Sequence, residues 1–102
     1  MKIIVDNLAL RYSDEGKGPV VVLLHGWGQQ LSTFDELAAS LASNFRVIRL
    51  DLPGFGESQR PREIWGVLQY VKLVRNFLNK LNIEQPFALI GHSFGGRVAI
   101  KA

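Results

Sequence analysis

Two short runs of consecutive apolar residues constrain the fold of this chain more than any other feature. Residues 20–24 are five apolar residues in a row, and residues 87–90 are four. A strand with one face in water alternates apolar and polar residues, whereas a run without alternation is typical of a strand buried on both faces. Such strands occur in parallel sheets that are covered by helices on both sides. The two runs therefore predict central strands of an α/β protein.

The segments between these runs have the periodicity of amphipathic helices. Thr33 and Glu36 have the spacing of a capping box, and the apolar residues that follow recur at helical spacing as far as Leu41, with Asn44 as a stop. A longer apolar stripe predicts a second helix over residues 67–81, closed by Asn82. We expect a strand at 45–50 between these helices, and a last helix at 97–102.

The N-terminal segment predicts a β-hairpin. Residues 2–5 and 8–12 are apolar-rich and are separated by Asp6 and Asn7, which tolerate tight-turn geometry. Loops are expected at 14–19, 25–31 and 53–61, where Gly and Pro gather. Strands that alternate with helices predict right-handed crossovers. The expected architecture is a three-layer α/β/α sandwich with a mostly parallel sheet.

Composition excludes several classes of function. The 102 residues carry a formal net charge of +3, but the basic residues are scattered among acidic ones, which argues against a nucleic-acid surface. Cysteine is absent, so disulfides and cysteine-ligated metals are excluded. No apolar run is long enough for a signal peptide or a membrane span, so we expect a cytoplasmic protein that does not bind membranes.

The segment Gly91-His92-Ser93-Phe94-Gly95 matches the pattern G-x-S-x-G. A serine hydroxyl becomes a useful nucleophile when a sharp strand-to-helix turn holds it exposed beside a base. The flanking glycines leave room for the turn and for close packing of the helix on the strand. The pentapeptide is weak alone, but here a buried strand precedes it and a helical pattern follows it, which is the context that the turn requires.

Two further loops follow predicted strands. One is His25-Gly26-Trp27-Gly28, and the other runs from Asp51 to Ser58 with two glycines and a proline. Open α/β sheets place their sites at the carboxyl ends of their strands. A backbone N–H of the first loop could therefore complete an oxyanion hole with one from the turn around Ser93.

These three motifs, each after a strand and in this order, resemble the α/β-hydrolase superfamily, and most closely its small, single-domain esterase-like members. The resemblance covers essentially the whole chain, so residues 1–102 are expected to be the N-terminal part of a single α/β-hydrolase domain. It implies that Ser93 is the nucleophile and that the backbone N–H groups of Trp27 and Phe94 form the oxyanion hole. The supporting loop residues would be His25, Gly26, Gly28, Gly91 and Gly95.

The resemblance also implies what the sequence lacks. The family's chain order is serine, acid, histidine, so the acid and the histidine would follow the helix after Ser93. We therefore expect a truncated chain, inactive alone. The substrate would be a small-molecule ester or related acyl compound, with no metal or cofactor. A serine at position 93 argues against the epoxide- and halide-cleaving relatives, which use aspartate there.

Each of these residues also has a simpler interpretation. His25 is expected to orient its own loop through hydrogen bonds, His92 to be structural, and Asp51 to brace its loop. Trp27 and Phe94 could line a substrate pocket or simply pack, and Phe55 is expected to pack. Ser93 itself could be a helix cap without chemistry. The alternative function is a non-catalytic, hydrolase-like binding or scaffold protein.

Overall fold

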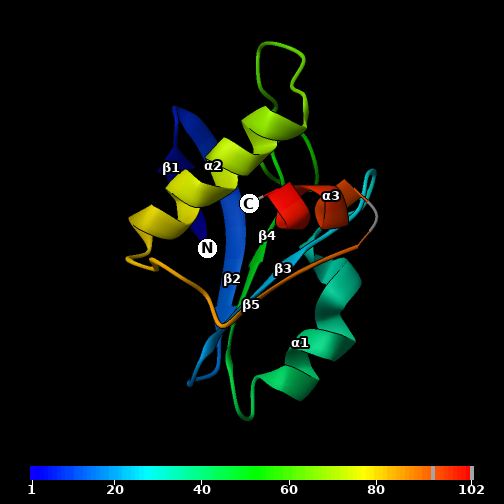
Figure 1. Cartoon of the computed structure of the whole chain (residues 1–102). Coiled ribbons are helices and arrows are strands. Elements are labelled where there is room, and N and C mark those ends of the chain that lie inside the picture. The colour runs from blue at the N-terminus through cyan, green and yellow to red at the C-terminus, as the bar shows by residue number, and fades with distance from the viewer. Residues whose placement is uncertain (93, 102) are drawn as a thin grey trace.

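A five-stranded sheet forms the middle layer of the protein (Figure 1). The computed structural model describes residues 1–92 and 94–101. The described strands are β1 (Lys2–Val5), β2 (Leu8–Glu15), β3 (Val20–Leu24), β4 (Arg46–Leu50) and β5 (Ala88–Gly91), in the order β1-β2-β4-β3-β5. β3 pairs in parallel with β4 and β5, whereas β2 pairs antiparallel with β1 and β4. The sheet is therefore more evenly mixed than expected, because the hairpin adds two antiparallel pairings. The prediction of a second central strand at 87–90 is wrong, because β5 is the last strand of the described sheet and leaves Phe87 and Ile90 exposed.

Helices cover both faces of the sheet, which confirms the three-layer sandwich. The described helices are the 3₁₀ helix η1 (Leu31–Phe34), α1 (Asp35–Leu41), α2 (Val67–Lys80) and α3 (Phe94–Lys101). α1 lies on one face, where Ala38 packs on Val21 and Leu23. α2 and α3 lie together on the other face (Figure 1).

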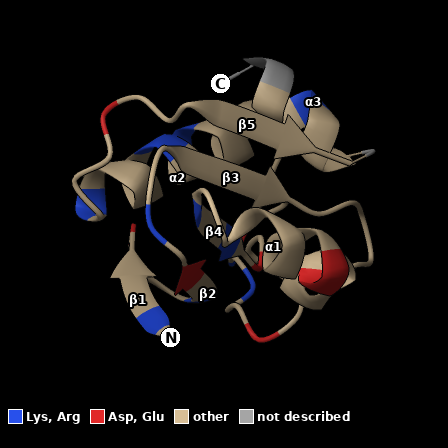
Figure 2. Ribbon diagram, turned by 90° about the horizontal axis from the view of Figure 1, so that it is seen from below, with Lys and Arg blue, Asp and Glu red and all other residues tan. Residues whose placement is uncertain are grey.

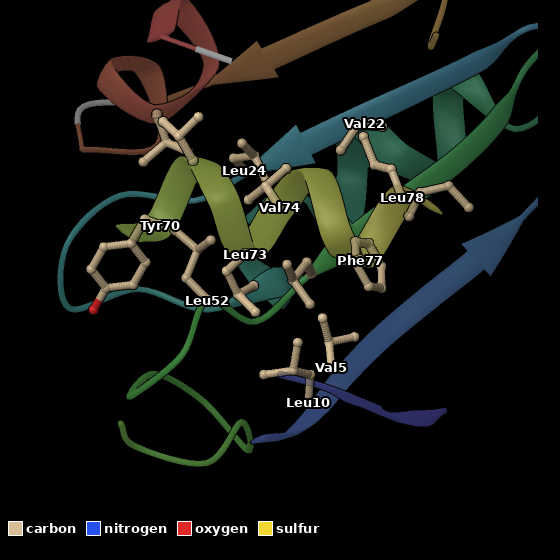
Figure 3. Close-up of a cluster of buried hydrophobic side chains, with 14 of the residues drawn as sticks. Val5, Leu10, Val22, Leu24, Leu52, Tyr70, Leu73, Val74, Phe77 and Leu78 are labelled. Atoms are coloured by element: carbon tan, nitrogen blue, oxygen red, sulfur yellow. The ribbon is translucent and has the colours of Figure 1, made fainter. Parts of the chain in front are cut away.

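The larger part of the core lies between α2 and the sheet. The predicted apolar stripe of α2 is buried there, and Figure 3 shows its side chains directed toward Leu24 of β3 and toward Val5 and Leu10 of the hairpin. Phe77, which is fully buried, makes an edge-to-face contact with Tyr12. Burying a side chain of this size contributes about 2–3 kcal/mol, so α2 is held mainly by packing.

The hairpin turn is as predicted. Asp6 and Asn7 have φ angles of 51° and 65°, the left-handed pair that a two-residue type I′ turn requires. The Asp6 carboxylate also accepts a hydrogen bond from Asn76 Nδ2 at 2.9 Å, which ties the turn to α2.

β4, β5 and α2 differ from the prediction by one residue at one or both ends, and three other elements differ by more. The capping box at Thr33 is wrong, because residues 31–34 form η1 and no side chain caps α1. β2 continues through Asp14 and Glu15, expected in a loop, because these residues pair with β4 and Asp14 forms an ion pair with Arg46. α3 begins at Phe94, three residues earlier than predicted, and the predicted end at Ala102 lies outside the described residues.

Charged residues are distributed over several elements. Figure 2 shows Lys and Arg on elements that include β1 and α3, with acidic residues interspersed. Arg11, Arg46 and Arg49 each form an ion pair with a carboxylate. Within the part of the chain that the structure describes, no helix is long and apolar enough to cross a bilayer.

Candidate active site

The carboxyl ends of β3, β4 and β5 lie level at one edge of the sheet. Leu24, the last residue of β3, is in register with Leu50 of β4 on one side and with Gly91 of β5 on the other. The loops that leave these three positions carry the three motifs found in the sequence. The pairing register therefore brings the motifs together at the edge where α/β sheets place their sites.

The turn between β5 and α3 needs glycine at two positions for lack of space. A Cβ added at Gly91 would lie closer than 3.0 Å to the carbonyl group of Gly95, and one added at Gly95 would lie as close to the carbonyl oxygens of Leu24 and His25. Real Cβ atoms are essentially never found this close to other atoms. The two glycines of the pattern G-x-S-x-G thus let α3 pack directly on the ends of β5 and β3. Ser93, between them, lies outside the described residues.

The first loop holds the peptide between Gly26 and Trp27 in one orientation. The carbonyl oxygen of Gly26 accepts a hydrogen bond from the Gln29 N–H at 3.1 Å and contacts His25 Nδ1 at 2.8 Å. A trans peptide is planar, so its N–H points opposite to its C=O. The two contacts on the Gly26 oxygen therefore also fix the direction of the Trp27 N–H. Gly28, with φ 76°, supplies the left-handed residue of this turn.

His25 is buried and uses both ring nitrogens for structure. Its Nε2 accepts a hydrogen bond from the Leu52 N–H at 2.9 Å, because a backbone N–H only donates. The proton of the neutral ring is then on Nδ1, which donates to the Gly26 oxygen. Burial lowers the pKa of His25 more than the Gly26 carbonyl and the charge of Asp51 raise it. His25 therefore holds two loops together, as expected from the sequence, and has no free nitrogen to act as a base.

Asp51 is fully buried and braces the loop after β4. Its carboxylate accepts hydrogen bonds from the Leu31 N–H at 2.6 Å, from the Glu57 N–H at 2.9 Å and from Arg11 Nε at 2.7 Å. The carboxylate occupies the space beside Gly56, where an added Cβ would collide with it. Three chain segments thus converge on one side chain, which is the bracing role that the sequence predicted.

A cavity of about 550 Å³ opens beside the first two loops. The lining residues include the aromatic Trp27, Phe55, Trp65 and Tyr70 and the charged Arg60, Arg62 and Glu63. Trp27 is 65% exposed and still makes edge-to-face contacts with Phe55 at 4.8 Å and with Phe94 at 5.2 Å between ring centroids. Trp27 therefore both lines the cavity and packs, and Phe55, expected only to pack, lines it too.

The same ring contacts bring the two predicted oxyanion residues together. Phe94, at the start of α3, touches Trp27 on one side and Tyr70 of α2 on the other, at 5.1 Å. Tyr70 donates a hydrogen bond from its hydroxyl to the Pro53 carbonyl at 3.1 Å, and burial raises its pKa. Figure 3 shows this hydroxyl at the edge of the core, directed away from the other labelled side chains.

Two residues of this region were missed by the sequence analysis. Arg11 reaches Asp51 and Glu57 from β2, a pairing that depends on the register of two strands and has no local signal. Gln29 places its side-chain oxygen 2.8 Å from the Gly26 N–H and 3.3 Å from Nδ1 of the exposed His92. A polar residue three positions after Gly26 in a tight loop was the available signal. Among residues 1–92 and 94–101, no group of three or more His, Asp or Glu could hold a metal ion.

Comparisons with known sequences place this arrangement in a family. The sequence model for the alpha/beta hydrolase fold matches residues 19–102. An uncharacterized protein of Mycobacterium tuberculosis is 41% identical over 86 residues, which make up 84% of this chain and 25% of that protein. The soluble epoxide hydrolase of a Corynebacterium strain is 33% identical over 95 residues, 93% of this chain and 33% of the enzyme.

Solved structures agree in fold. A membrane phospholipase A, described as a bacterial virulence factor, matches with a TM-score of 0.92 and 32% identity over 97% of this chain and 33% of its own. An alpha/beta hydrolase fold protein from Burkholderia ambifaria matches with a TM-score of 0.92 and 25% identity over 100% of this chain and 37% of its own. The chain thus spans about a quarter to a third of the length of these relatives. On this evidence the chain belongs to the α/β-hydrolase family.

Proposed function

We propose that the whole protein is a serine hydrolase that cleaves carboxylic esters or related acyl bonds through an acyl-enzyme at Ser93. The observation that carries the proposal is the turn around Ser93, where Gly91 and Gly95 stand at positions that admit no Cβ. Such a turn joins a strand to a helix closely enough to present a serine at the sheet edge. In the proposed reaction the Ser93 oxygen attacks the carbonyl carbon, the alcohol leaves with a proton, and water then releases the acid.

The proposed oxyanion hole consists of the backbone N–H groups of Trp27 and Phe94. Support comes from the contact between their rings and from the fixed orientation of the Gly26–Trp27 peptide. Donors that are held in place before the reaction stabilise the developing charge without reorganisation, and one such donor is worth about 3 kcal/mol in the transition state.

The base that activates Ser93 is proposed to come from the part of the protein that follows residue 102. Both ring nitrogens of His25 form hydrogen bonds with backbone groups, and burial lowers its pKa, so His25 does not act as the base. The family's order of serine, acid and histidine puts the two remaining residues after Ser93. The 102-residue chain alone is therefore proposed to be inactive.

The cavity supports a substrate with an apolar part. Its rings offer apolar surface and polarisable faces, which suit an alkyl or aryl group next to the scissile bond. Hydrolysis of an epoxide is the second candidate, because the Corynebacterium relative carries that name. The family resemblance weighs against it, since epoxide-cleaving members have aspartate at the position of Ser93.

The test is covalent labelling of the whole protein with a serine-directed phosphonate, read by mass spectrometry of the peptides. We expect one adduct on Ser93, no adduct in the Ser93→Ala variant, and normal labelling in a Ser32→Ala control, since Ser32 lies on the exposed side of η1. Equal labelling of the Ser93→Ala variant would end the assignment. A protein that neither labels nor turns over esters or epoxides would favour the binding or scaffold alternative.

A further inference from the structure

We infer that Gln29 is a positioning residue that locks the loop carrying Trp27 against the turn that carries Ser93. The inference rests on the proposed function, because it concerns how the oxyanion hole keeps its shape. The loop after β3 and the turn after β5 lie side by side (Figure 1), and the Gln29 side chain lies between them.

Gln29 forms hydrogen bonds with both the N–H and the carbonyl oxygen of Gly26. Its side-chain Oε1 accepts a hydrogen bond from the Gly26 N–H at 2.8 Å, and its own N–H donates to the Gly26 carbonyl at 3.1 Å. Gly26 is buried, so its N–H needs a hydrogen-bond partner within the protein, and Gln29 Oε1 supplies it. Because the Gly26 carbonyl belongs to the same peptide as the Trp27 N–H, Gln29 controls the direction of the proposed oxyanion donor.

The side-chain oxygen of Gln29 also contacts the turn after β5. The atom of Gln29 that faces the Gly26 N–H is an acceptor, and it lies 3.3 Å from Nδ1 of His92. A hydrogen bond between them therefore needs the proton of His92 on Nδ1. The backbone N–H of His92 donates to the Leu24 carbonyl at 3.0 Å, which fixes this residue to the end of β3. Gln29 thus joins Gly26 to the residue directly before Ser93.

The loops leave little room for another arrangement. A Cβ at Gly26 would lie 2.8 Å from Gln29 Oε1 and 3.1 Å from the His92 carbonyl oxygen. Without the Gln29 oxygen, the Gly26 N–H is left unsatisfied, and the loop is held at Gly26 only through the contacts on its carbonyl oxygen. Misdirecting a donor that acts in the transition state lowers kcat and leaves KM nearly unchanged.

The experiment compares Gln29→Met with Gln30→Met in the whole protein, with a chromogenic carboxylic ester as the substrate. Gln30 is the exposed neighbour, and its side-chain oxygen accepts from Arg11 instead. We expect Gln29→Met to lower kcat about tenfold to a hundredfold, less than the full loss of an oxyanion donor, and Gln30→Met to change it less than threefold. Gln29→Asn, which stays polar but is one methylene shorter, is expected to behave like Gln29→Met and replaces it if that variant does not fold.

Two further measurements report on the contact itself. In the wild type, the ¹⁵N shifts of His92 should show the proton on Nδ1, and the Gly26 amide should exchange slowly with solvent. Gln29→Met should lose both signatures, whereas Gln29→Glu, which keeps an acceptor oxygen, should retain the slow exchange. Turnover that persists in Ser93→Ala would overturn the proposed function. Turnover that depends on Ser93 but is equal in Gln29→Met and Gln30→Met would overturn the role of Gln29 alone.

Discussion

Adding one methyl group at Gly95 tests the packing of α3 on the sheet. The new Cβ would lie closer than 3.0 Å to the carbonyl oxygens of Leu24 and His25, which are backbone atoms of a central strand end and cannot turn aside. Relief requires α3 to move away from β3, and overpacking of this kind costs about 1–3 kcal/mol. The neighbouring Gly96 is the matched control, because the nearest atom to its added Cβ is 3.4 Å away. Gly96→Ala should gain up to ~1 kcal/mol from the higher helix propensity of alanine.

The assay is urea denaturation of the whole protein, with the two alanine variants measured beside the wild type. The free energies of unfolding of Gly95→Ala and Gly96→Ala should differ by about 1–4 kcal/mol, with Gly95→Ala the less stable. Ester turnover should fall in Gly95→Ala and persist in Gly96→Ala, since moving α3 also moves the turn before it. Equal stabilities for the two variants would refute the steric account of the motif.

The remaining predictions concern the buried Asp51, the buried His25 and the activity of the 102-residue chain alone. Asp51→Asn, which removes the charge that holds Arg11, should destabilise the whole protein by ~3 kcal/mol in urea denaturation, whereas the exposed Asp35→Asn should cost less than about 1 kcal/mol. Burial lowers the pKa of His25 below its ordinary 6.5, so the unfolded state binds a proton that the folded state excludes. The contribution of His25 to the free energy of unfolding should therefore be fully present above about pH 6.5 and be lost as the pH falls below it. The free energy of unfolding, measured between pH 7 and 5, should depend less on pH in His25→Gln than in the wild type. The 102-residue chain alone should show no ester turnover above its Ser93→Ala control, and a clear excess would mean that it contains a base.

Much of the fold could be predicted from local sequence signals. The unbroken apolar run 20–24 identified a central strand, because burial on both faces removes the polar alternation. The Asp6-Asn7 pair identified the hairpin, since few residues other than glycine accept positive φ. The stripe of α2 gave that helix to within one residue at its C-terminal end. In each case the signal and the structural cause lie in the same short segment.

The errors arose where tertiary contacts decide the structure. Asp14 looks like a loop residue, but the partner strand and Arg46 keep it extended in β2. Gly95 was predicted to lie in the turn before the last helix, but it lies inside α3, at a position where a Cβ would collide with the end of β3. Thr33 has the spacing of a cap, but residues 31–34 form a 3₁₀ helix instead, which is anchored by the Leu31 N–H on Asp51.

The motifs of the site could be predicted from the sequence, but the side-chain contacts that hold its loops together could not. Strand ends followed by glycine-rich loops indicated where the motifs would meet, and the register of β3 places them there. The Arg11–Asp51 ion pair joins residues 40 positions apart, and the Gln29–His92 contact joins residues 63 positions apart. Neither pairing has a local pattern, so both needed the three-dimensional arrangement to be seen.

The most direct test of the central claim is to trap the acyl-enzyme. The whole protein is mixed with excess p-nitrophenyl butyrate, quenched in acid within the first turnovers and digested for mass spectrometry. The account predicts a butyryl group on the peptide that contains Ser93, and neither the adduct nor turnover in Ser93→Ala. Full turnover by Ser93→Ala, or an acyl group on another residue, would contradict it.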